Sequence, residues 1–340
     1  MAVEPLAAVI TLLAVLLAYV NGFHDASNAV STTITTRALR ERTALGMAAL
    51  LNLFGALLGI GLVTISSTWA FERMGLGHIT AGVDTPGPVL LWIILAGVLV
   101  TILWDLITWW MGMPSSSWHA LFAGVGGASL VLGWDADWPT IARSSLLPTA
   151  FAPLLGAAAA YATMQLISRM LTSDRLRSGH LRFAQTVSAG LVATAHGLQD
   201  ALIPMAVIVA VATTSPMPGA VLASAPYTVA IAIALGTLMG GHRIIRTLGS
   251  RLTDLTTPQG FSAEAATATL MGLVSLGMGL PVSSSHSIAA GIMGAGLARG
   301  PRALRLPVVR RILAVWLATP FACFGMGLII ARLAQTSIGI

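Results

Sequence analysis

The sequence predicts an all-α protein that crosses a membrane many times. Of its 340 residues, 56% are hydrophobic and 9% are charged, whereas an ordinary soluble domain has about 25% charged residues. A soluble chain of this length could not bury so much apolar surface around one core. A bilayer can accommodate it, because each membrane-spanning helix needs about 20 mainly apolar residues. We therefore expect about 10–12 membrane-embedded helices and half-helices.

The predicted helices follow the apolar runs of the sequence, which are residues 6–20, 44–65, 89–111, 146–170, 184–195, 205–212, 227–245, 265–277 and 312–334. Two shorter apolar pieces, 120–132 and 288–297, each follow a serine-rich motif. They are too short to span a bilayer alone. We expect re-entrant or broken helices there, because such elements are tolerated where protein or a water-filled cavity surrounds them.

The charges predict the orientation in the membrane. All 18 basic residues are arginine and the net charge is +6. They concentrate in four loops, 37–42, 169–182, 242–251 and 299–311, which the positive-inside rule places in the cytoplasm. No soluble region is left to form a nucleic-acid-binding face. The first apolar run follows Glu4 instead of a basic segment, so we interpret it as a retained span and not a signal peptide.

Cysteine chemistry is excluded by composition. The chain has one cysteine, Cys323, within an apolar run. One thiol can form neither an internal disulfide nor a cysteine-based metal site. A lone cysteine in an apolar run usually acts as a small, inert hydrophobic residue that packs between helices.

Two polar motifs occur twice, in the same order. Residues 22–26 and 197–201 both read Gly-x-x-Asp-Ala, and residues 114–119 and 281–286 share Pro, Ser at +2 and +3, and His at +5. Glycines follow both prolines at +10 and +13. We infer a duplicated chain with a first repeat at 1–168, a cytoplasmic basic linker at 169–182 and a second repeat at 183–340. In duplicated transporters the substrate lies near the midplane, where the repeats meet.

The serine-rich motifs have the composition of an anion site. Proline is favoured in the first turn of a helix and serine is a good N-cap. A helix that begins inside the membrane offers free N–H groups and a positive dipole end to an anion, and hydroxyls add neutral donors. Helix capping with serine-mediated packing is the simpler alternative. The candidate substrate-binding serines are Ser115, Ser116, Ser117, Ser283, Ser284 and Ser285.

Asp25 and Asp200 are the matched acids of the first motif. A carboxylate in a membrane costs at least about 2.5–3.5 kcal/mol and persists when it is paired, protonated or coordinating. The pair could bind a co-transported cation, carry a proton, or accept a hydrogen bond from a protonated oxyanion. The last role favours phosphate, which keeps an acidic proton near neutral pH, over sulfate, which does not. A structural acid between helices is the alternative.

The remaining candidates surround these motifs. Asn21, Asn28 and Gln199 could ligate a cation, and His24 could carry a proton because histidine titrates near neutral pH. Asp105 joins the cation-coupling set because of its expected depth in the membrane, whereas Glu264 could merely cap its helix. His119 and His286, at matched positions, are expected to orient the serine-bearing turns.

These motifs resemble the inorganic phosphate transporter family often called Pit. The segment 21–30 is similar to the family's first signature in its bacterial form, 114–119 and 281–286 to its paired Pro-Ser-Ser/Thr-x-His motifs, and 257–264 to a further family segment. The resemblance covers nearly the whole chain. It implies two inverted repeats that hold phosphate between the aspartate and serine motifs, in a multi-pass protein of the bacterial inner membrane. A homodimer is a further possibility.

The resemblance is incomplete at two places. Gln199 stands where the family has Asn, with Leu202 and Ile203 replacing polar residues, and Trp118 stands where the first serine motif usually continues. Even with these departures, the sequence predicts a symporter of inorganic phosphate that is coupled to protons or sodium. The resemblance to the bacterial form favours protons, and phosphate could be carried as a neutral metal complex. A sulfate or other oxyanion permease is the alternative. No cofactor, resident metal or enzymatic activity is expected.

A hydrolase and a passive channel are the two other classes of protein that these motifs could indicate. An intramembrane Ser-His-Asp hydrolase needs one nucleophile and one base in a single arrangement, whereas duplicated motifs suit a two-sided binding site. An anion channel would pass phosphate without a cation gradient.

Overall fold

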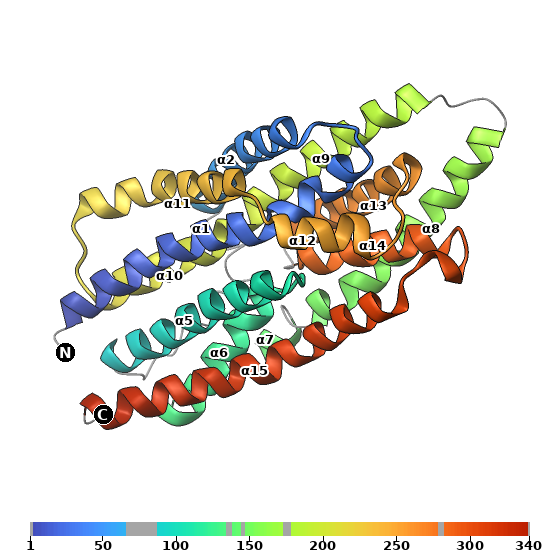
Figure 1. Ribbon diagram of the computed structural model, residues 1–340. Coiled ribbons are helices and arrows are strands. Elements are labelled where there is room, and N and C mark those ends of the chain that lie inside the picture. Colours follow the sequence, from blue (N-terminus) through green and yellow to red (C-terminus); the bar gives the residue numbers. More distant parts are fainter. Residues whose placement is uncertain are drawn as a thin grey trace.

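The computed structural model describes residues 3–65, 87–133, 138–143, 147–172, 178–277 and 282–338. These residues form a bundle of helices (Figure 1). Within them, seven helices are long and apolar enough to cross a membrane. The long helices are α1 (Val3–Thr35), α2 (Glu41–Ile65), α5 (Gly87–Met111), α8 (Leu147–Thr172), α9 (Ser178–Asp200) with α10 (Leu202–Thr214), α11 (Gly219–Met239) and α15 (Leu306–Ile338).

Two short helices begin at the serine-rich motifs, as predicted. They are α6 (Ser117–Leu132) and α14 (Ser284–Leu297). In Figure 1, α6 lies in the half of the molecule that holds both chain ends, and α14 lies in the other half. The other short elements are α7 (Trp138–Ile141), α12 (His242–Arg246), α13 (Thr257–Leu270), the π-helical segments Thr247–Arg251 and Met271–Gly277, and a 3-10 turn at Pro301–Ala303.

The helices pair across the two halves of the sequence. Helix α1 packs on α11, and α2 packs on α9. Likewise, α6 packs between α5 and α15, and α14 packs between α13 and α8. These contacts form two matching sets. The contact of α1 with α11 corresponds to that of α9 with α2, and the contacts of α6 correspond to those of α14. A duplicated chain would pack in this way, although the repeat boundaries at 168 and 183 remain a prediction.

Glycines at matched motif positions make these close contacts. Gly22 of α1 lies against the backbone of Ile233, and Gly197 of α9 lies against that of Asn52. The glycines at +13 of the serine motifs behave alike: Gly127 faces the backbone of Phe324, and Gly294 faces that of Ala157. Small residues let membrane helices approach closely, so the duplicated glycines set the spacing of the bundle.

The two aspartate motifs differ in backbone form. Helix α1 continues through Asp25 to Thr35 without a break, whereas the expected span ended at residue 20. Helix α9 ends at Asp200, and α10 starts two residues later. Pro204 explains the break, because it has no N–H to donate to the carbonyl of Asp200 and its ring would collide with that carbonyl.

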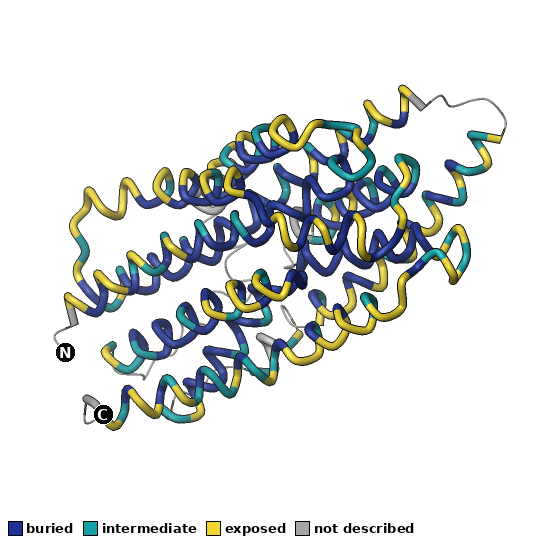
Figure 2. The backbone as a smooth tube through the Cα atoms, viewed as in Figure 1, coloured by how far each residue is buried: buried dark blue, intermediate teal, exposed yellow. Residues whose placement is uncertain are grey.

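The outward faces are apolar, as a lipid-facing surface requires. Figure 2 shows exposed residues along the outer side of α15, where Leu317 and Phe321 are 69% and 74% exposed. The spanning helices identify a multi-pass membrane protein.

Three of the four basic loops gather at one end of the bundle. His242 Nδ1 lies 2.9 Å from Glu41 Oε1, which joins loop 242–251 to loop 37–42. Arg305 donates to the carbonyl of Ser250 at 2.5 Å, which joins loop 299–311 to loop 242–251. This clustering agrees with a single cytoplasmic face. The predicted linker 169–182 overlaps the end of α8 and the start of α9, and its residues 173–177 lie outside the described chain.

Candidate functional site

The serine two residues after the proline has the same role in both motifs. Ser116 is the N-cap of α6 and accepts from the His119 N–H at 3.4 Å. Ser283 is the N-cap of α14 and accepts from the His286 N–H at 3.2 Å. Both short helices therefore begin with a serine cap deep in the protein, as the sequence predicts, and each directs its positive dipole end at the site.

Asp25 connects the two halves of the chain. Ser285, at the start of α14, donates to its Oδ1 at 2.7 Å. Asn28, one helical turn after Asp25, donates to Ser285 at 2.9 Å and to Ser284 at 3.1 Å. All four side chains are buried. Asp25 and Ser285 are 260 residues apart in the sequence. The first aspartate motif and the second serine motif thus form one polar cluster across the interface between the halves.

A second contact joins both aspartates through one histidine. His196 Nε2 lies 3.0 Å from Asp200 Oδ2 and 3.6 Å from Asp25 Oδ2. One ligand atom from each of these three residues falls within 4.8 Å of the others. The other ring nitrogen of His196, Nδ1, lies 3.2 Å from Asn52 Oδ1, and this hydrogen bond orients the imidazole. Two carboxylates and an imidazole at this spacing can share protons or hold a cation.

The first serine motif reaches the cluster through His24. His24 Nδ1 lies 2.6 Å from Asp25 Oδ1, and its Nε2 lies 3.1 Å from the hydroxyl of Thr108. That hydroxyl is in turn 2.8 Å from the hydroxyl of Ser115. Ser115, Thr108, His24 and Asp25 therefore form a continuous hydrogen-bonded chain, along which a proton could pass.

Asp105 lies on the other side of the same motif. Its Oδ2 accepts from Ser117 at 2.8 Å, and its side chain is completely buried. Its Oδ1 has no hydrogen-bond partner within the described residues. A buried carboxylate oxygen without a donor is costly, so this group is suited to bind a proton or a cation.

The two half-sites are not equivalent. Counted from the prolines, Ser285 corresponds to Trp118, and counted from the aspartates, Asn28 corresponds to Ile203. Ser285 and Asn28, which form hydrogen bonds at Asp25, therefore have counterparts in the other repeat that lack a hydroxyl and an amide. Trp118 and Ile203, two of the departures from the family motifs, thus stand at the positions where the other repeat has the hydrogen-bond donors Ser285 and Asn28.

The other predicted residues lie at or near this network, and all but the half-buried His119 are buried. The carbonyl of Val282 accepts a hydrogen bond from Gln199, which fixes the entrance to α14 to α9. Both amide atoms of Asn21 are buried without a partner among the described residues. The ring centres of His119 and His286 lie 5.4 Å apart, and those of His286 and Trp316 lie 4.2 Å apart, with the rings tilted in both pairs. Their backbone N–H groups, and not the rings, bond to the capping serines.

Sequence reasoning missed two contributors and assigned no role to a third, His196. Thr108 and Asn52 lie outside the motifs, in plain apolar helices, and carry no sequence signal. His196 had a signal, since it stands four residues before Asp200 as Asn21 does before Asp25. Glu264 does not cap its helix, because Thr256 and Gln259 do so. It is buried between α1 and α9, where it accepts from Thr32 and, at 2.8 Å, from Ser188.

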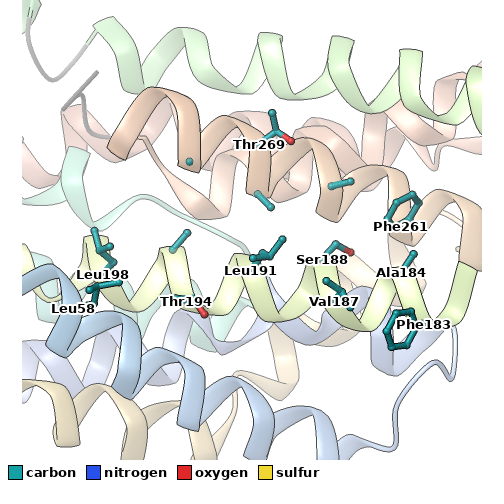
Figure 3. Close-up of a pocket in the computed structure, with 14 residues that line it drawn as sticks. Leu58, Phe183, Ala184, Val187, Ser188, Leu191, Thr194, Leu198, Phe261 and Thr269 are labelled. Carbon is teal, nitrogen blue, oxygen red and sulfur yellow. The ribbon is translucent and has the colours of Figure 1, made fainter. Parts of the chain in front are cut away.

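A groove of about 620 Å³ lies between α9 and α13, with α2 at its edge (Figure 3). Figure 3 shows Val187, Leu191 and Leu198 along one wall and Phe261 on the other. The lining contains no charged side chain. Such a groove suits an apolar occupant and not an oxyanion, so the candidate anion site is the buried network between the helix starts.

The comparisons with known proteins decide the family. The model of the phosphate transporter family matches residues 21–180 and 172–327. The chain belongs to the phosphate transporter family. A protein of Rhizobium meliloti named "probable low-affinity inorganic phosphate transporter" is 35% identical, over 88% of both chains. Proteins of the same name from Mycobacterium leprae and Bacillus subtilis are 34% and 30% identical, over 88% of this chain and 71% and 89% of theirs.

A solved structure supports the fold. The structure titled "The sodium-dependent phosphate transporter" matches with a TM-score of 0.78, covering 98% of this chain and 99% of that one at 20% identity. The predicted phosphate transporter resemblance and the all-α membrane fold are therefore confirmed, and the chain is a transporter and not an enzyme. These relatives are named for phosphate, and the sulfate alternative gains no support from them.

Proposed function

We propose that this family member is a cation-coupled symporter of inorganic phosphate. The observation that carries the proposal is the cross-half cluster at Asp25, where Ser285 of one half donates to the carboxylate of the other and His196 bridges it to Asp200. A small anion held at this junction would touch both halves, so rocking one half against the other would expose it to either side of the membrane.

The donors around Asp25 favour phosphate over sulfate. The two capped helix starts and the hydroxyls of Ser284 and Ser285 supply neutral donors and positive dipole ends. A protonated phosphate can donate its remaining proton to a carboxylate such as Asp25, whereas sulfate has none to donate and would be repelled. The cluster thus selects an oxyanion that still carries a proton.

Protons are the proposed coupling ion. Asp25 contacts two imidazoles, His24 and His196, and the second imidazole contacts Asp200. This arrangement offers several proton positions in one buried cluster. The same Asp25, His196 and Asp200 set could receive a divalent ion carried in with phosphate as a neutral complex, with the metal as cargo.

Uptake into proteoliposomes tests the function. Radiolabelled phosphate should accumulate above its external concentration when an inward proton gradient is imposed, and a sodium gradient at constant pH should not replace it. Arsenate should compete, because it keeps a proton as phosphate does, and sulfate should not. Accumulation with sodium alone would overturn the choice of proton, and equilibration without any gradient would identify a channel.

Two substitutions test the site. Asp25→Asn and Asp200→Asn should each abolish transport while leaving the protein inserted in the membrane. Asp254→Asn provides a matched control, since Asp254 is 88% exposed and pairs with Arg305 at the surface. If both buried variants transport as well as this control, the site is assigned wrongly.

A further inference from the structure

Three arginines converge on one cavity at the basic end of the bundle. The cavity is about 290 Å³ and is lined by Trp110, Met111, Gly112, Arg243, Arg246 and Arg251. It contains three positive charges and no acid. Arginines of the cytoplasmic face usually need no ligand, since the positive-inside rule alone accounts for them. Their convergence on one hollow is what requires a further explanation.

The neighbouring acids are already engaged. Glu41 lies 2.9 Å from His242, and Asp254 lies 2.6 Å from Arg305. Across the described parts of the chain, the guanidiniums of Arg246 and Arg251 have no hydrogen-bonded acceptor. The positive charge of the cavity is therefore uncompensated by the protein itself, and an anion entering it would meet free donors.

One wall of the cavity is rigid. Arg243 donates to the carbonyl of Trp110 at 2.9 Å, and its guanidinium lies 5.3 Å from the ring centre of Trp109. Gly112 adopts a positive φ of 68°, and a Cβ there would come within 3.2 Å of the carbonyl of Arg243. The end of α5 is thus held against α12, and the other two arginines face a preformed edge.

The surroundings of the cavity indicate what kind of anion it takes. The outer face of α5 exposes Leu103, Leu106, Ile107 and Trp110, the last being 66% exposed. This apolar stripe lies along a spanning helix and ends at the arginines. Acyl chains would lie along the stripe while a headgroup phosphate sits in the cavity, which is how basic pockets at the cytoplasmic ends of membrane helices hold anionic lipids.

We propose that Arg246 and Arg251, against the edge formed by Arg243 and Gly112, bind the phosphate of an anionic phospholipid headgroup. Gly112 is three residues before Ser115, which is hydrogen-bonded to Thr108 beside His24. A lipid bound here fixes the end of α5 next to the substrate cluster. It therefore stabilises the folded protein and supports transport without touching the transported phosphate.

The variant Arg246→Gln/Arg251→Gln tests this, and Arg243 is left intact because it bonds to the fold. The matched control is Arg310→Gln/Arg311→Gln, which removes the same charge from exposed positions at the start of α15. Purified protein in detergent would be titrated with phosphatidylglycerol, with phosphatidylcholine and with inorganic phosphate. Thermal unfolding and native mass spectrometry would report stability and bound lipid.

Phosphatidylglycerol should raise the unfolding midpoint of the wild type and the control by several degrees, with lipid retained in the mass spectrum. The cavity variant should lose most of this shift and this lipid, and phosphatidylcholine should not reproduce the shift. Inorganic phosphate, as the proposed substrate, should stabilise the wild type, the control and the cavity variant alike through the central cluster. An equal shift in the cavity variant would overturn the proposal. So would a shift with inorganic phosphate that only the cavity variant loses, because the cavity would then be a site for the free anion. These readouts do not depend on transport, so they stand apart from the proposed symport.

Discussion

At the scale of single residues, the Asp25 side of the cluster has donors that the Asp200 side lacks. Ser285 donates to Asp25, and the matched position in the first repeat is Trp118, which has no hydroxyl. Asn28 supports Ser284 and Ser285, and its counterpart Ile203 cannot. We therefore infer that phosphate binding depends more on the second serine motif than on the first, despite their similar sequences.

Ser285→Ala tests this asymmetry. The change removes a donor to a buried carboxylate, and a hydrogen bond to a charged group contributes about 1.5–3 kcal/mol. Apparent affinity for phosphate should fall by about 10-fold or more if that energy is lost from the bound state. The measurement is the concentration dependence of phosphate uptake in proteoliposomes.

Ser129→Ala is the control for that experiment. Ser129 is a buried serine of α6 whose hydroxyl bonds to the carbonyl of Val125 in its own helix. It should leave the affinity unchanged. Equal losses in Ser285→Ala and Ser129→Ala would mean that packing, and not the contact with Asp25, is responsible.

Much of this cluster was predictable, because the duplicated motifs name both aspartates and all six serines. Their partners were not. Thr108 and Asn52 sit in helices whose pattern is simply apolar, and only the packing of α5 on α1 and of α2 on α9 brings them to His24 and His196. A sequence gives spacing along one chain, whereas these contacts depend on which helices pack together.

At the scale of elements, two helices behave differently from expectation for local reasons. The sequence predicts a first span that ends at residue 20, yet α1 runs to Thr35, because neither proline nor glycine interrupts the helix between Asp25 and Thr35. The second copy breaks at Asp200, since Pro204 interrupts the hydrogen bonds. The half-helices α6 and α14 were predictable because proline and serine mark their starts explicitly.

Gly127→Ala and Gly294→Ala test the matched packing of these half-helices. An added methyl group would collide with the backbone of Phe324 in one case and of Ala157 in the other. Forcing packed helices apart costs roughly 1–3 kcal/mol. Both variants should therefore unfold several degrees below the wild type, by similar amounts, in thermal unfolding of detergent-purified protein.

Gly46→Ala is the reference substitution, because no atom lies within 4 Å of a Cβ at this position of α2. Alanine is favoured over glycine in a helix by about 1 kcal/mol, so this variant should be as stable as the wild type or slightly more stable. If only one of the two packing variants is destabilised, the half-helices are not packed equivalently and the argument for duplication weakens.

At the scale of the whole molecule, the arginine loops and the chain ends lie at opposite ends of the bundle. Figure 1 shows both chain ends together, beside the turn between α10 and α11. Helix α11 crosses from that turn to Gly240, next to the basic loop 242–251. The positive-inside rule predicts that the basic loops lie in the cytoplasm, so we expect the start of α1 and the end of α15 on the outer side of the cell membrane.

Cysteine labelling tests this orientation, and the chain suits it because its one native cysteine is buried. In a Cys323→Ala background, Arg40→Cys and Arg302→Cys place single thiols in two different basic loops at exposed positions. Gly219→Cys places one at the exposed start of α11, at the other end of that span. A membrane-impermeant maleimide added to intact cells should label only Gly219→Cys, whereas inside-out vesicles should reverse the pattern. Labelling of either arginine position from outside would invert the molecule in the membrane, and it would move the arginine cavity to a leaflet where the positive-inside rule gives no reason for its charge.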